Sequence, residues 1–446
     1  MTLIFDIGKT NKKYFLFDDE FNTIESDSLS FDEIVDDDGY PCDDIEVIKT
    51  WILEVYKGLL SKYVGKLSYV NISSYGASIV HLDKDFKIVT PLYNYIKPVD
   101  DSIFKPLYNK YKGVAEMSRM TGSPKLELLN SGFQLYWLKI TKEKIYSKIS
   151  YSLHLPNYLS YLFHNVLLSE YTSIGCHTAM WNFDSMKYHQ WINDEKITDK
   201  FSSIVKGDSK YEIANNIHVG TGLHDSSAAL IPYIKTRKSK FILLSTGTWS
   251  IAFNPFNNEA LTTFQLTNDC LTYLSIDGAP VVASRLFLGH EHEFQITKLN
   301  AHFGVDPSIY KSIKYNANLT SQMMSDNRSY FCLQHLGDEA FKVEYCDFST
   351  YEIAYHRLML EMVKKQIFAL NLILSKTDKI DELIIDGGFV NNDLYCKMLN
   401  RLLPEFKVYR SNLKSGAAIG AALCINPNLE RKLGNTKNMQ ITLVNK

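Results

Sequence analysis

The sequence lacks the marks of several common protein classes. Its seven cysteines are scattered and include no Cys-x-x-Cys pair, which argues against a disulfide framework and a zinc ribbon. No apolar run approaches the roughly 18 to 20 residues of a membrane span. The first residues, MTLIFDIGKT, have no basic segment and are interrupted by Asp6, unlike a signal peptide. We therefore expect a cytoplasmic protein with no membrane partner.

The chain also lacks an excess of charge of either sign. It has 48 Lys+Arg against 50 Asp+Glu in 446 residues, a net charge of −2. Phosphate backbones are bound by an excess of basic residues on one face, so we expect no nucleic-acid partner. Binding of one small phosphate stays compatible with this balance. The hydrophobic share of 45% is typical of a globular chain, and the length suggests two or three domains.

Strand and helix patterns alternate along the chain. Apolar residues recur at helical spacing over 45–64, and a strand pattern follows over 67–73. In the last third a second helical stripe, over 359–374, leads into a strand at 382–385 and then a helix over 394–402. This alternation predicts an α/β protein.

Two segments half a chain apart resemble each other. FDIGKTNKKYFLF near the start and LLSTGTWSIAFNP at 243–255 are each a strand, a glycine turn and a second strand. Such hairpins also recur by chance. The alternative is a pair of similar domains, each presenting one turn to a phosphate chain across a cleft. We place the boundary in the polar stretch 235–240, giving domains 1–236 and 237–446.

The first turn is not a P-loop. That motif needs a glycine where Leu3 stands and a helix after the turn, whereas a strand pattern follows here. Backbone N–H groups of a hairpin turn nevertheless form an anion site. Asp6, just before the turn, either holds a magnesium-bound water or caps the turn.

Two later segments could carry chemistry. IHVGTGLHD at 217–225 places Asp225 at a strand-to-helix junction, where it is either a general base for a sugar hydroxyl or a helix cap. LIIDGGFVNN at 383–392 places two glycines where a flat ligand could approach the backbone. The HEHE segment at 290–293 lacks metal-ligand spacing, and we expect a solvated helix start there.

Taken in order, these motifs resemble the FGGY carbohydrate kinases, within the actin/hexokinase/heat-shock ATPase fold group. DIGKTNKK is similar to the first phosphate loop, LSTGTWS to the second, DGGFVNN to the adenosine loop and GTGLHDSSAAL to the catalytic aspartate motif. The His-Asp pair with GTW about twenty residues later is most similar to the rhamnulokinase and fuculokinase branches. The resemblance implies an α/β fold of two ribonuclease-H-like domains around a central cleft.

The resemblance further implies ATP-dependent phosphorylation of a ketose at a terminal hydroxyl. The sugar would be similar to L-rhamnulose or L-fuculose, with xylulose and ribulose as further options. Asp225 would be the base, and Asp6 would help to place Mg²⁺. The sugar would contact Gly76, His224 and Ser226. ATP would contact Gly8, Lys9, Thr10, Asn11, Lys12, Thr246, Gly247, Thr248, Gly387, Gly388 and Asn391.

The sugar-facing segments depart from the family pattern. Ser78 stands where relatives usually have an acidic residue, and Tyr93-Asn94-Tyr95-Ile96-Lys97-Pro98 replaces a Y-x-D-x-R pattern. These departures leave the sugar open, and they favour one alternative, a non-catalytic ATP-binding sensor on the same fold. A chaperone-like or filament-forming ATPase is a third hypothesis. The sequence leaves a monomer and a homodimer both open.

Overall fold

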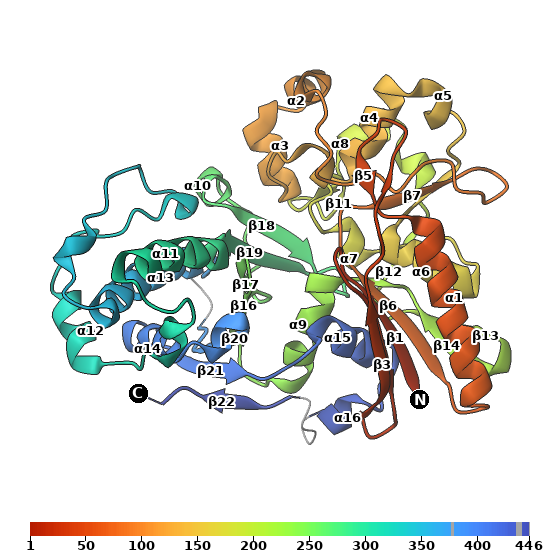
Figure 1. Ribbon diagram of the computed structural model, residues 1–446. Helices are drawn as coiled ribbons and strands as arrows, with labels where there is room; N and C mark the ends of the chain where they lie inside the picture. Colours follow the sequence, from red (N-terminus) through yellow and green to blue (C-terminus); the bar gives the residue numbers. More distant parts are fainter. Residues whose placement is uncertain (376–378, 434–438, 446) are drawn as a thin grey trace.

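The computed structural model describes residues 1–375, 379–433 and 439–445. Two seven-stranded sheets lie on either side of a pair of central helices, α9 (Asp225–Thr236) and α15 (Gly416–Ile425) (Figure 1). The strands of the first sheet are β1 (Thr2–Ile7), β2 (Lys12–Phe17), β3 (Thr23–Leu29), β6 (Tyr69–Ser74), β13 (Lys210–Ile213), β14 (Ile217–Gly220) and β15 (Leu223–His224). Those of the second are β16 (Phe241–Thr246), β17 (Ser250–Asn254), β18 (Cys270–Leu274), β19 (Pro280–Leu286), β20 (Glu382–Gly387), β21 (Lys407–Ser411) and β22 (Ile441–Leu443).

Helices cover the sheets, and a mostly helical layer with short two-stranded sheets lies above the first of them (Figure 1). The remaining helices are α1 (Ile45–Lys62), α2 (Lys105–Lys110), α3 (Gly113–Thr121), α4 (Gly132–Thr141), α5 (Glu143–Tyr146), α6 (Leu155–His164), α7 (Tyr171–Ile174), α8 (Gln190–Asp194), α10 (Thr263–Thr267), α11 (Leu288–Phe303), α12 (Ala317–Met324), α13 (Tyr351–Leu372), α14 (Asp393–Leu402) and α16 (Glu430–Leu433). The short strands are β4 (Ile34–Val35), β5 (Pro41–Cys42), β7 (Ile79–Leu82), β8 (Tyr151–His154), β9 (Ser169–Glu170), β10 (Trp181–Asn182), β11 (Lys187–Tyr188) and β12 (Ile204–Val205). Among the described residues, none of these helices is both long and apolar enough to cross a membrane.

The two large sheets share one topology. In the first, the order β3-β2-β1-β6-β14 joins three antiparallel strands to two parallel ones, and in the second β19-β17-β16-β20-β21 repeats that pattern. The predicted hairpins are β1–β2 and β16–β17, which occupy equivalent places in the two sheets. Both predictions, the α/β class and a pair of ribonuclease-H-like domains, are therefore confirmed. The ends of β1, β16 and β20 all face the region between the sheets.

Helices α9 and α15 cross with almost no side chain between them. A Cβ added at Gly420 would lie 1.8 Å from the carbonyl oxygen of Ala228, so only glycine allows this approach. The surrounding core contains residues of both halves of the chain, from Ile4 and Leu223 to Ile384. The crossing thus joins the two sheets through one continuous apolar core.

A buried aspartate fixes the shape of the first hairpin turn. Asp43 accepts hydrogen bonds from Lys12 at 2.7 Å, Lys9 at 2.6 Å and the Tyr75 hydroxyl at 2.7 Å. Lys12 is only 1% exposed, and its ammonium also donates to the Lys9 carbonyl. Burial raises the pKa of Asp43, but the hydrogen bonds from Lys12, Lys9 and Tyr75 outweigh burial, so the pKa lies below its usual value.

The tip of the β18–β19 hairpin reaches from the second sheet into the first domain. Leu274 is fully buried in a core cluster otherwise built from residues of the first half of the chain, and it packs where Gly175 has no side chain. Ile276 packs on Gly207 in the same way, and its carbonyl accepts a hydrogen bond from the Gly207 N–H at 2.8 Å. We call this contact, Leu274 and Ile276 on Gly175 and Gly207, the clasp.

The helix crossing predicts a contrast between two glycine-to-alanine variants. Gly420→Ala should destabilise the protein by about 1–3 kcal/mol or more, because the added methyl group meets the Ala228 carbonyl. Gly58→Ala, on the open face of α1, should stabilise it by about 0.5–1 kcal/mol, because no atom lies within 4 Å of the added Cβ. Thermal unfolding measures both. Equal effects of the two variants would show that α9 and α15 do not approach so closely.

The Asp43 network predicts a pH-dependent contrast. Asp43→Asn should destabilise the protein by about 3–5 kcal/mol near pH 7, because it leaves Lys12 buried without its partner. The folded pKa of Asp43 is depressed, so its contribution is complete above about pH 4, the pKa of an unfolded aspartate, and is lost as the pH falls through the folded value. The difference in unfolding free energy between wild type and variant should therefore shrink below about pH 4. A difference that stays constant into acid would contradict this account.

Candidate active site

Three carboxylates face one cavity between the two sheets. The cavity has a volume of about 340 Å³ and is lined by Asp6 from the end of β1, Asp225 from the start of α9 and Asp386 from the end of β20. Gly8 and Ser226, both predicted site residues, also line it. Asp386 was not predicted as a site residue. It could have been found by the argument used for Asp6, since it too ends a strand just before a glycine turn.

The dipoles of two helices oppose the negative charge of this cavity. The first turns of α9 and α15 both contribute to its wall, so two positive helix ends face the carboxylates. Burial raises the pKa of Asp6 to about 6, with the charge of Asp225 adding to the shift and Lys13 opposing it. Burial also raises the pKa of Asp386. The crowding of negative groups favours a bound cation.

One carboxylate oxygen of Asp225 already accepts hydrogen bonds, and the other is available to accept one. Its Oδ1 accepts a hydrogen bond from the Ser226 N–H at 2.6 Å and lies 3.3 Å from the Nε2 atom of His224. Oδ2 accepts no hydrogen bond from any residue that the structure describes. The side chain is 34% exposed and lies at N1 of α9, with His224 rather than Asp225 at the N-cap position.

His224 is buried in a cluster next to Gly76. Its Nε2 atom lies 3.1 Å from the Cys176 Sγ atom, its Nδ1 atom lies 3.3 Å from the Ser227 hydroxyl, and its ring stacks on Tyr273. A Cβ at Gly76 would lie 2.9 Å from the imidazole ring. Burial lowers the pKa of His224, and the charge of Asp225 only partly offsets this. The imidazole is therefore neutral at neutral pH.

The segments that depart from the expected family pattern form a separate ionic network. Lys97, 6% exposed, pairs with Asp36 at 2.6 Å and with Asp38, which also binds Lys142 at 2.7 Å. The lysine therefore neutralises an acidic run from another part of the chain. Ser78 is buried, and its carbonyl accepts a hydrogen bond from the Leu155 N–H.

The predicted residues of the first turn lie in two environments. The Gly8 N–H donates to the Asn11 carbonyl at 2.9 Å, which closes the turn, and Thr10 and Asn11 are exposed. Lys9 is partly exposed although it pairs with Asp43 and Glu33. The Lys12 ammonium, in contrast, is held by Asp43 and the Lys9 carbonyl away from the cavity. The side chain of Lys12 shapes the turn.

A second, larger cavity lies beside the second turn. Its volume is about 570 Å³, the size of a small-molecule site. Four of the predicted residues line it, namely Gly247, Thr248, Gly388 and Asn391. The structure thus brings together two segments that are about 140 residues apart in sequence.

Two further predicted residues hold these segments together rather than lining the cavity. The Thr246 hydroxyl donates to the Asp386 carbonyl at 2.6 Å and accepts from the Phe389 N–H at 3.0 Å. Gly387 has a φ of +84°, and a Cβ there would lie 2.0 Å from the Thr246 carbonyl oxygen. Only glycine therefore fits at 387.

The expectation of a solvated helix start at HEHE is wrong. The segment does begin a helix, α11, but Glu291 is fully buried and His292 is 6% exposed. Glu291 accepts from the His335 N–H at 2.7 Å and from its ring nitrogen at 2.8 Å. His292 lines the larger cavity and lies 3.0 Å from the Tyr355 hydroxyl, and burial lowers its pKa to about 4.

Other residues of the larger cavity carry no motif that sequence reasoning could use. Tyr310 and Lys311, on a short 3-10 helix (Ile309–Ser312), and Lys314 after it reach the cavity from the connection between α11 and α12. Phe389 stands inside the recognised glycine motif, but an apolar side chain there is also typical of a core position. Tertiary packing alone assigns these residues to the cavity.

The residues of the smaller cavity fit a magnesium ion. Mg²⁺ prefers carboxylate oxygens and keeps several waters, which the cavity volume allows. Asp6 and Asp386 are the two carboxylates that would hold it directly or through water. Burial raises the pKa of both carboxyl groups, and a cation bound between them would lower it again.

Comparison with solved structures places the fold among sugar kinases. A carbohydrate kinase from Novosphingobium aromaticivorans superimposes with a TM-score of 0.79 at 22% identity, covering 96% of this chain and 94% of that one. The ligand-bound xylulose kinase from Lactobacillus acidophilus gives 0.77 at 16% identity, covering 99% and 93%. At these identities the likeness establishes the fold.

Curated relatives are similar over part of their length. Rhamnulokinases from Oceanobacillus iheyensis and Halalkalibacterium halodurans are each 22% identical, over 49% and 55% of this chain. The matches span about half of those relatives, 48% and 52% of their lengths.

Family profiles match most of the chain. The N-terminal domain of the FGGY family of carbohydrate kinases matches residues 1–231, and the FGGY C-terminal domain matches residues 238–325 and 367–432. Together with the two-domain fold and the cavities at its centre, these matches show that the chain belongs to the FGGY family of carbohydrate kinases.

Proposed function

We propose that this protein transfers the terminal phosphate of ATP to a terminal hydroxyl of a ketose. One observation carries the proposal: a cavity with three carboxylates opens between two hairpin turns, and a nucleotide-sized cavity lies beside the second of them. Domain 1–236 would supply the sugar site and the first turn, and domain 237–446 would bind the nucleotide. FGGY membership supports this division.

The proposed sugar is similar to L-rhamnulose or L-fuculose. The His224-Asp225 pair supports this choice, and so do the relatives named rhamnulokinase. Xylulose and ribulose are the next candidates, because a solved xylulose kinase shares the fold. We further propose that the protein acts in the cytoplasm as a monomer or homodimer. All seven cysteines are free thiols, which fits a reducing compartment.

Asp225 is the proposed general base. Its Oδ1 is held by the Ser226 N–H, so Oδ2 is left to accept the proton of the attacking sugar hydroxyl. The hydroxyl oxygen bonds to the terminal phosphorus, the bond to the bridging oxygen breaks, and ADP leaves with that oxygen. The proton stays on Asp225 until solvent removes it.

His224 and Gly76 would place the sugar. Both ring nitrogens of His224 already have partners, so a sugar hydroxyl that binds the neutral imidazole would take the place of one of these contacts. Gly76 lets the backbone pass directly against the ring, because a Cβ there would lie 2.9 Å from the imidazole and 3.2 Å from the Cys176 Sγ atom. Ser226 would contact the sugar from the first turn of α9, where it also lines the carboxylate cavity.

The phosphates would be held mainly by backbone. Gly8 to Asn11 form one turn and Thr246 to Thr248 the other, and the first turn of α15 adds further N–H donors. The ammonium of Lys9 lies near the first turn. Magnesium, when bound at Asp6 and Asp386, would neutralise charge on the phosphate oxygens. Closing the domains around the substrates would keep water from acting as acceptor.

A ketose panel with Mg-ATP tests the proposed function. We expect ADP release with rhamnulose, fuculose, xylulose or ribulose, and a loss of turnover of about a hundredfold to ten-thousandfold in Asp225→Asn with ADP affinity unchanged. Asp306→Asn, an exposed aspartate that lines neither cavity, is the matched control and should keep full activity. Nucleotide binding with no ADP release from any sugar would favour the sensor alternative, and full turnover in Asp225→Asn would remove Asp225 from the mechanism.

Substitutions at two neighbouring glycines, Gly387 and Gly388, should affect folding and nucleotide binding separately. A Cβ at Gly388 has its nearest neighbour at 3.8 Å and projects beside the larger cavity, so Gly388→Val should fold normally. It should weaken ADP binding by about tenfold or more, equivalent to about 1.4 kcal/mol. Gly387→Val should instead lower the thermal stability, because its Cβ meets the Thr246 carbonyl at a left-handed φ. Calorimetric titration and thermal unfolding of both variants measure this. Unchanged ADP affinity in Gly388→Val would place the nucleotide elsewhere.

A further inference from the structure

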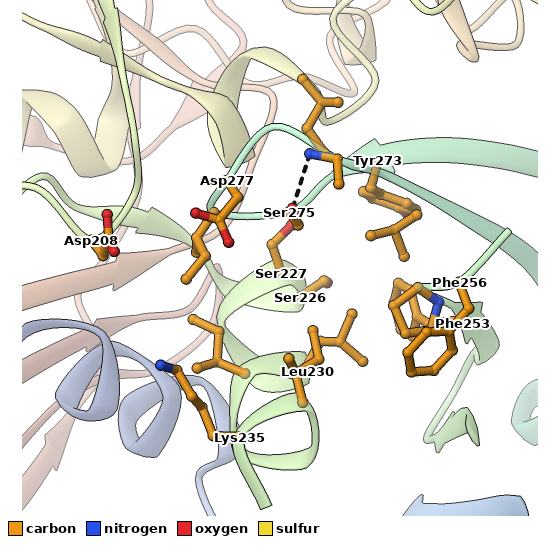
Figure 2. A pocket seen from close by; sticks show the side chains of 17 residues that line it. Asp208, Ser226, Ser227, Leu230, Lys235, Phe253, Phe256, Tyr273, Ser275 and Asp277 are labelled. Atoms are coloured by element: carbon orange, nitrogen blue, oxygen red, sulfur yellow. Dashed lines mark hydrogen bonds between the residues drawn. The ribbon is translucent and has the colours of Figure 1, made fainter. Parts of the chain in front are cut away.

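A third cavity lies between the clasp and α9. Its volume is about 340 Å³, within the range of sites for small ligands, and its walls come from α9, the end of β17 and the β18–β19 hairpin (Figure 2). The proposed reaction uses none of this space. The hairpin over it is held closed by a hydrogen bond from the Ala279 N–H to the Ser275 hydroxyl at 3.1 Å.

The two ends of this cavity differ in chemistry. Phe253, Phe256 and Tyr273 form an aromatic end, whereas Asp208, Asp277 and Lys235 stand at the other end (Figure 2). Between the ends the wall is apolar apart from three serine hydroxyls. A ligand that fills the cavity therefore has an apolar body and a charged head.

The sign of that charge follows from the ion pairs. Lys235 is paired with Glu430 at 3.1 Å, and Asp277 is paired with Lys206 at 3.4 Å. Asp208 has no ion pair with any residue that the structure describes. The group without an ion pair is thus a carboxylate, exposed to solvent like the two ion pairs beside it, and it favours a positively charged head at this open end of the cavity.

The cavity shares its walls with the active site. Ser226 and Phe253 line both this cavity and the carboxylate cavity. Tyr273, at the aromatic end, stacks on the ring of His224 with centroids 6.0 Å apart and planes inclined by 15°. An occupant pressing on Tyr273 would therefore shift the imidazole of the sugar site.

We propose that this cavity binds a small organic cation, with an aromatic or branched aliphatic body and a primary ammonium group, and that its occupancy is coupled to His224 through Tyr273. The ammonium binds Asp208, and the body packs on the three aromatic rings. By linkage, a ligand of the sugar site that moves His224 changes the affinity for the cation by the same factor by which the cation changes that ligand's affinity.

Three probes of similar shape but different charge test whether the cavity binds an organic cation. Calorimetric titration would compare 2-phenylethylammonium, 3-phenylpropanoate and 2-phenylethanol on the full chain. We expect the ammonium to bind about tenfold more tightly than the carboxylate, equivalent to about 1.4 kcal/mol, and Asp208→Asn to remove most of that preference. No binding of the ammonium at millimolar concentration, or equal binding of the carboxylate, would overturn the proposal.

A blocking variant locates the probe. Ala279 is exposed at the hairpin, so Ala279→Trp should fold and fill the mouth of the cavity, weakening binding by about tenfold or more. Ala301→Trp, at an exposed position of α11 outside the cavity, is the matched control and should bind as wild type does. Equal affinity in both variants would show that the probe binds elsewhere. None of these measurements requires kinase activity, so failure of the proposed reaction leaves them unaffected.

The coupling between this cavity and His224 is tested by NMR spectroscopy. In protein labelled at histidine Cε1, the His224 resonance is identified by its loss in His224→Gln. Binding of 2-phenylethylammonium should shift this resonance and leave that of His218, which stacks on Tyr69 in the first sheet, in place. An unmoved His224 resonance at saturating probe would refute the coupling.

Discussion

The close crossing of α9 and α15 is the contact on which the rest of this structure depends. Because Gly420 carries no side chain, the two helices approach until backbone meets backbone at Ala228. Both helices begin at the same cavity, so their approach fixes the distance between Asp225 and the first turn of α15. A looser crossing would separate Asp225, the proposed base, from the proposed phosphate site by the width of a side chain. Gly420, one helical turn from the cavity wall, would thus set the geometry of the proposed site.

The cleft does not depend on a large number of charged side chains, because the position of each charged or polar group matters more. The whole chain is nearly neutral. Two helix ends face the cavity and the charge of Lys13 acts on Asp6, while Lys12 is turned away toward Asp43. This arrangement suits phosphoryl transfer, in which the protein positions groups and spreads negative charge. Backbone donors keep the same position in every state of the reaction, whereas free lysine side chains would have to be ordered on binding.

Local patterns in the sequence predicted the α/β class, the two hairpins and the place of Asp6, whereas the ribonuclease-H-like form of the two domains was predicted from the family resemblance. The strand–glycine–strand repeat predicted both hairpins, and the position of Asp6 before a turn predicted its place in the cavity. The prediction that failed concerns a contact between segments that are far apart in the sequence. HEHE is polar, so nothing local indicates that Glu291 is buried by His335, 44 residues away. Asp386 is different: its position at the end of a strand before a glycine turn is visible in the sequence, and only its meeting with Asp6 depends on how the two sheets face each other.

The clasp has a consequence for how the protein could move. Leu274 is fully buried in the core of the opposite domain, and exposing such a side chain costs about 1.5–3 kcal/mol before the lost hydrogen bond at Gly207 is counted. Separation of the domains on that side is therefore rare. If the domains open, we expect the rotation axis to lie close to this hairpin, so that the edge of the cleft farthest from it moves most. On the proposed function, ATP and the sugar would enter at that edge, and ADP and the phosphorylated product would leave by the same route.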